Sequence, residues 1–120
     1  MSAKEKKPKK EKFVEPHFKE LVEVWFNFCR EKFNEPPTFD GSAPRDLKGI
    51  IKALRERSET KNIEWTVDNA QKRFHNFLEF AWQEWWLQKN WLLSNINRQK
   101  DKIFFNIRAV LDKQPTHPFP

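Results

Sequence analysis

Apolar residues recur with the 3.6-residue spacing of an α-helix in four successive segments, and this spacing constrains the fold more than any other feature. The first helix is expected to begin near Pro16 and to stop at Pro36-Pro37, because consecutive prolines cannot continue a helix. Alternation typical of a strand is absent over any useful length, so the sequence predicts an all-α fold. The other expected helices cover residues 44–57, residues 66–90, and a segment from Ser94 or Asn97 to about 111.

These segments predict a compact bundle of four principal helices, with the third helix at its centre. Ser42 and Thr66 are the expected N-caps of the second and third helices, since their hydroxyls can accept backbone N–H groups. One arc of the third helix is strongly apolar, which is typical of a central helix. That arc comprises Val67, Ala70, Phe74, Phe77, Leu78, Ala81 and Trp85.

A chain of 120 residues has the length of one ordinary domain. Residues 13–114 are assigned to the helical bundle, because the apolar spacing lies within them. Residues 1–12 contain six lysines and no apolar side chain beyond the first methionine and Ala3, so we expect a disordered basic arm. Residues 115–120 contain three prolines and are expected to form a short Pro-rich tail.

Composition argues against most catalytic classes. Two glycines cannot supply a glycine-rich phosphate loop, and one cysteine cannot form an internal disulfide or a thiolate-rich zinc site. Cys29 lies on the apolar face of the first helix, where burial would raise the pKa of its thiol. His17, His75 and His117 lack metal-binding spacing. We therefore expect a cytoplasmic protein without a membrane span, catalytic activity, metal or cofactor.

The net charge of +6 is unevenly distributed along the chain. The arm carries +4, which leaves only +2 for the remaining 108 residues. Within that body, residues 13–40 carry −3, residues 44–61 and 65–113 carry +3 each, and Glu64 adds −1. The sequence thus predicts an acidic first segment followed by two basic ones, and the acidic segment could cover the basic residues of the second helix.

Basic residues in the second helix repeat at intervals of three and four, which places them along one side of the helix. This basic stripe consists of Arg45, Lys48, Lys52 and Arg55. Duplex DNA presents one negative charge per ~1.7 Å of its axis, so a helix edge bearing cations could follow a phosphate strand. The competing interpretation is a solvated surface that keeps the protein soluble.

Two further groups of cations extend this pattern. Lys6, Lys7, Lys9 and Lys10 of the arm would add sequence-independent affinity through counterion release, or would only solubilise the terminus. Arg98 and Lys102 lie in the fourth helical segment and give it a second basic surface. Together the three groups favour DNA or another polyanion as a partner.

Several large aromatic residues fall outside the main apolar arcs. Phe80, Trp86 and Phe105 have no obvious inward position, and clustered exposed aromatics are typical of protein interfaces or base-stacking surfaces. The alternative is a wider core, in which other helices surround the third on several sides. The first interpretation predicts that these aromatics form a partner-binding patch, and the second predicts that they pack against the surrounding helices.

The stretches Phe39–Ile51, Phe74–Trp86 and Leu92–Arg98, followed by Ile103 and Ile107, resemble small helical proteins encoded by phages and mobile elements. Some of these proteins are replication-organiser or DNA-binding accessory domains. The resemblance covers about residues 39–108 and rests on hydrophobic spacing, so it transfers no catalytic or ligand residue. It implies a helical fold and a role in replication or in regulation of such an element.

The expected function is therefore that of a non-catalytic nucleic-acid-associated accessory protein. It would bind phosphates through the basic stripe and the arm. The alternative is a protein-interaction adaptor that uses exposed aromatics to bind itself or a host or phage protein.

Overall fold

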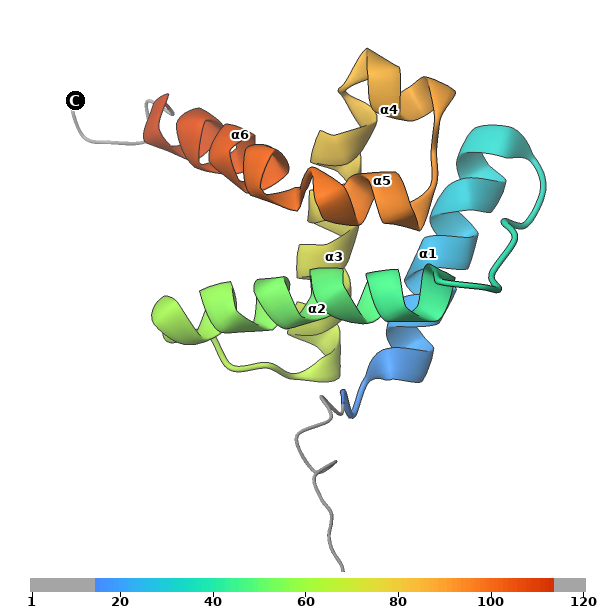
Figure 1. The fold of residues 1–120 in the computed structure, drawn as a ribbon. Coiled ribbons are helices and arrows are strands. Elements are labelled where there is room, and N and C mark those ends of the chain that lie inside the picture. Colours follow the sequence, from blue (N-terminus) through green and yellow to red (C-terminus); the bar gives the residue numbers. More distant parts are fainter. Residues whose placement is uncertain (1–14, 114–120) are drawn as a thin grey trace, which may run out of the picture.

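The computed structural model describes residues 15–113, with side chains as far as Val110. Every regular element in this range is a helix, which confirms the all-α prediction. Figure 1 shows four principal helices, α1, α2, α3 and α6, and two short ones, α4 and α5. The predicted arm, 1–12, and tail, 115–120, lie outside the described residues. The bounds are α1 Phe18–Phe33, α2 Ala43–Thr60, α3 Val67–Trp82, α4 Trp85–Lys89, α5 Leu93–Arg98 and α6 Lys100–Lys113.

Helix α3 forms the centre of the bundle, as its apolar arc predicts. It contacts α1, α2, α4 and α6, while α5 lies alongside α2 (Figure 1). Phe74, Phe77 and Leu78 are completely buried on α3, and Leu47 and Ile50 are completely buried on α2. Burying a side chain of this size contributes roughly 1.5–3 kcal/mol, so this shared interior supplies the main stabilising contacts.

Aromatic rings join α1 to α3 and to the segment before α5. The Trp91 ring stacks on Trp25 and Phe28, with centroid separations of 5.8 and 5.6 Å. It also meets Trp82 edge to face at 4.9 Å. Such pairs add about 0.5–1.5 kcal/mol beyond the area they bury. Trp91 therefore holds the α4–α5 connection against the first and third helices.

The expected helix starts are confirmed only in part. Thr66 caps α3, and its hydroxyl accepts the backbone N–H of Asn69 at 3.1 Å. Ser42 occupies the N-cap position of α2 without accepting such a bond, and its hydroxyl donates to the Asp46 carboxylate at 2.9 Å. Pro16 lies in a turn before α1 rather than within its first helical turn.

The prediction that the third helix continues to Asn90 is wrong. Helix α3 ends at Trp82, and Glu84 has an extended backbone before α4 begins. The break changes which side chains face inward: Leu87 is completely buried, whereas Trp85 is 67% exposed. In an uninterrupted helix, Trp85 would have continued the buried arc of α3. The predicted inward position of Trp85 is therefore wrong as well.

The fourth predicted helix is also divided. Helix α5 ends at Arg98, and α6 begins at Lys100 after Gln99 leaves the helical conformation at φ −102° and ψ 12°. Ile103 and Val110 are seven residues apart, which would place both on one side of a helix, but Ile103 is buried whereas Val110 is 43% exposed. Near this end of α6, the helix has moved away from the shared interior.

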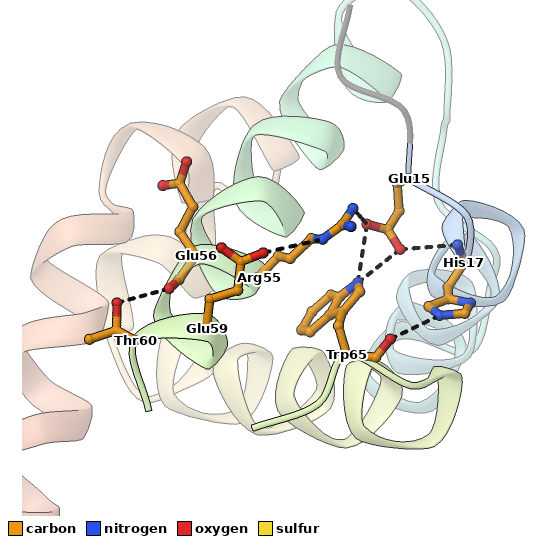
Figure 2. Close-up of polar contacts among 7 residues, drawn as sticks. All are labelled: Glu15, His17, Arg55, Glu56, Glu59, Thr60 and Trp65. Atoms are coloured by element: carbon orange, nitrogen blue, oxygen red, sulfur yellow. Dashed lines mark hydrogen bonds and ion pairs between the residues drawn. The ribbon is translucent and has the colours of Figure 1, made fainter. Parts of the chain in front are cut away.

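A buried carboxylate connects the chain before α1 to two other parts of the bundle (Figure 2). Glu15 has a side chain that is 0% exposed. It accepts the indole N–H of Trp65 at 3.0 Å, the backbone N–H of His17 at 3.0 Å and an Arg55 N–H at 3.5 Å. The His17 ring lies 3.2 Å from the Trp65 carbonyl oxygen, so the two segments are linked twice. Three donors replace the water that this carboxylate loses on folding.

Glu15→Gln should lower the free energy of unfolding by about 1–3 kcal/mol, because an amide cannot accept all three donors and carries no charge for Arg55. Urea unfolding followed by tryptophan fluorescence measures the loss. Glu23→Gln is the matched control, since Glu23 is exposed on α1 and should change stability by less than about 0.5 kcal/mol. Equal stabilities of the two variants would contradict a structural role for Glu15.

Candidate polyanion-binding surface

The basic stripe lies on the side of α2 away from its buried residues. Arg45, Lys48 and Lys52 are exposed, and Arg55 is half-buried. Among the described residues, Arg45 and Lys52 have no carboxylate partner, and Lys48 holds its ammonium 5.5 Å from the Phe18 ring centroid. At 1.5 Å per residue, the stretch from Arg45 to Lys52 spans about 10 Å, or roughly three nucleotides of one strand.

Arg55 differs from the other members of the stripe because carboxylates hold it in place. Its guanidinium lies 3.5 Å from Glu15 and 3.9 Å from Glu59, as Figure 2 shows. Its side chain is 32% exposed. The acidic first segment therefore pairs with this end of the stripe through Glu15, before α1 begins, while Arg45, Lys48 and Lys52 form no ion pair with a described carboxylate of α1.

Arg98 and Lys102 form a separate basic region. Arg98 is exposed at the end of α5 and donates to Asn95 Oδ1 at 3.1 Å. Lys102 is exposed on α6 and lies 5.3 Å from the Trp86 ring centroid. Neither cation lies on α2, the helix that carries the stripe. The predicted contacts of Lys6, Lys7, Lys9 and Lys10 lie outside the described residues.

Only one of the three aromatic candidates is well exposed. Phe105 is 69% exposed on α6. Phe80 and Trp86 are partly buried and pack against the core, as the wider-core alternative predicts. The Trp86 indole N–H donates to Glu84 at 3.2 Å, and Asn106 donates to the same carboxylate at 2.7 Å. These bonds attach the start of α4 to α6.

The groups that could perform chemistry have ordinary structural surroundings. His75 lies 3.5 Å from Glu79 on the same exposed helix surface, and His117 is outside the described residues. No group of three or more potential metal ligands occurs in the described part of the chain. Cys29 is only 2% exposed, and burial raises the pKa of its thiol to about 11, opposed by a smaller effect of the Trp91 indole. The prediction of a buried thiol with a raised pKa is confirmed.

Sequence reasoning missed a second basic cluster, between α2, α3 and α6. It brings together Arg57 and Lys61 from the end of α2, Arg73 from α3 and Arg108 from α6. Neither Arg57 nor Arg73 has an acidic residue three or four positions away on its own helix, which is the available sequence signal. Their convergence could not be predicted, because it depends on how three helices pack.

Comparisons with protein-family models, curated proteins and solved structures find no match for this chain. Among residues 15–113, no helix is both long and apolar enough to span a membrane. Functional inference therefore depends on the surfaces described above.

The raised pKa of Cys29 predicts a loss of stability in alkaline solution. The folded state retains the thiol proton more tightly than the unfolded state, so this contribution is complete below about pH 8.5 and disappears as the pH rises toward about 11. Urea unfolding at about pH 8 and about pH 10.5 should show that the free energy of unfolding of the wild type falls between these two pH values. The fall should be smaller by up to about 2 kcal/mol in Cys29→Ala, which has no thiol to ionise. Identical pH dependence in both proteins would contradict the prediction.

Proposed function

We propose that this protein is a non-catalytic accessory protein associated with nucleic acid, with a role in replication or regulation of a phage or mobile element. The observation that carries the proposal is the stripe on α2, where Arg45, Lys48 and Lys52 are exposed and have no carboxylate partner among the described residues. Three accessible cations on one helix side match the repeated charges of a phosphate backbone.

The stripe would act by binding phosphates rather than by reading bases. Lysine provides a point charge, and arginine provides a planar fork that can hold two phosphate oxygens. Such contacts set position and contribute affinity without sequence information. Sequence preference would then have to come from a protein partner or from another part of the chain.

The stripe makes binding depend on salt in a measurable way. Fluorescence anisotropy of labelled duplex and single-stranded oligonucleotides should show binding at about 50 mM salt that weakens as salt increases. In Lys48→Gln/Lys52→Gln, the log–log salt slope for duplex DNA should become about 1.8 less steep, because each lysine neutralises about one phosphate, worth ~0.9 in slope on a duplex.

The matched control is Lys72→Gln/Lys89→Gln, which removes the same charge elsewhere. Like Lys48, Lys89 is exposed beside a ring, with its ammonium 5.9 Å from the Trp85 ring centroid. This control should retain the slope. Equal effects in the two double variants would show that net charge rather than the stripe drives binding, and an absence of binding by the wild type would reject the proposal.

A second candidate function is a protein-interaction adaptor, favoured by the exposure of Phe105 and Trp85 at 69% and 67%. Hydrogen bonds of Glu84 and Asn106 attach the start of α4 to α6 beside these two residues. Large exposed aromatics contribute strongly to binding when a partner buries them. Self-association is the form of this interaction that is simplest to measure, because it requires no second protein.

For the adaptor, sedimentation over a concentration series should reveal self-association that Phe105→Gln weakens by at least about tenfold, the effect of losing about 1.4 kcal/mol of buried contact. Leu92→Gln is the control, because Leu92 is also an exposed apolar residue, 58% exposed, in the segment before α5. A wild-type protein that remains monomeric throughout would contradict self-association.

A further inference from the structure

A basic cavity lies where the C-terminal halves of α2 and α6 extend to the same side of α3 (Figure 1). Its volume is about 300 Å³. Leu54, Phe104 and Ile107 give it apolar walls. Its polar lining consists of Arg57, Lys61, Arg73, Asn76 and Arg108, and no acidic side chain among those described as far as Val110 lines it.

No carboxylate among the side chains described as far as Val110 compensates the positive charge of the arginines in this cavity. Arg57 stacks its guanidinium over the Phe104 ring at 4.0 Å from the centroid, which leaves the edge of the guanidinium free to donate. The Arg73 Nε atom is buried and has no hydrogen-bond partner. Among residues 15–110, none of the four cations forms an ion pair.

The position of Arg73 is electrostatically unfavourable in the free protein. Partial burial lowers the pKa of its guanidinium, and the neighbouring positive charge of Arg57 lowers it further. A favourable interaction with the helix dipole can account for Arg57, which lies in the last turn of α2. It does not account for Arg73, which lies in the middle of α3.

We propose that this cavity binds the phosphate group of a small ligand or of a nucleotide. A phosphate monoester carries about −1.5 to −2 charge and three acceptor oxygens, and arginine forks bind such groups through paired hydrogen bonds. The anion would offset the repulsion between Arg57 and Arg73 and would give the buried Nε–H an acceptor. Partial burial strengthens these charge-assisted bonds relative to the exposed stripe.

The cavity is distinct from the surface in the proposed function. On a helical projection of α2, Arg57 lies beside the buried face on one side and the stripe lies on the other, because successive residues are rotated by about 100°. Failure of one proposal therefore leaves the other intact. Pocket variants test the phosphate site, and the Lys48 and Lys52 variants test the stripe.

The test measures thermal unfolding with inorganic phosphate, with adenosine monophosphate and with chloride at equal ionic strength. A ligand that binds only the folded state should raise Tm in a saturable manner, by several degrees when it is in large excess over its Kd. Arg73→Met should abolish this shift without lowering Tm in chloride, because it removes a buried cation and an unmet donor while keeping similar volume.

Arg108→Gln provides a second variant at an exposed position, so that loss of the shift does not depend on replacing a half-buried side chain. Lys89→Gln, at an exposed position on α4, is the control and should retain the full shift. Oligonucleotides with and without a 5′-phosphate identify the source of the bound phosphate. If only the phosphorylated form raises Tm, and Arg73→Met removes that rise, the cavity binds a terminal phosphate of nucleic acid. The proposal is overturned if no phosphate probe raises Tm above chloride, or if Arg73→Met and Arg108→Gln retain the shift.

Discussion

The buried carboxylate of Glu15 is the interaction on which the arrangement of the first two helices depends. A charge that loses its water must be met by donors, and here the donors come from the chain before α1, from α2 and from the residue before Thr66. The same contact sets the electrostatics of the basic stripe. It commits Arg55 to an internal ion pair and leaves Arg45, Lys48 and Lys52 available to solvent.

The fold could be predicted where burial follows local periodicity. The spacing of Leu47, Ile50, Ile51 and Leu54 in the sequence places them on one side of a helix, and all four are buried. The division between α3 and α4 could not be predicted in this way, because the apolar residues on both sides remain compatible with a helix. What accompanies the break is a long-range contact, in which Asn106 of α6 donates to Glu84 twenty-two positions earlier.

The candidate sites show the same limit. The stripe repeats at helical intervals, so the exposure of Arg45, Lys48 and Lys52 could be predicted from the sequence alone. The pairing of Arg55 could not, because Glu15 lies forty residues away. The cavity could not be predicted either, because Arg57, Arg73 and Arg108 belong to three helices and form no motif along the chain.

Helix α2 contributes cations to both basic surfaces, but the environments of these cations differ. On the stripe, exposed side chains meet a partner in water, where a unit-charge pair at about 4 Å contributes only ~1 kcal/mol and salt screens it further. In the cavity, apolar walls and half-buried guanidiniums reduce that screening. The stripe therefore suits a long polyanion bound through many weak contacts, whereas the cavity suits a single phosphate held by converging donors. One basic helix can thus support two modes of anion binding, because its neighbours bury its two sides to different extents.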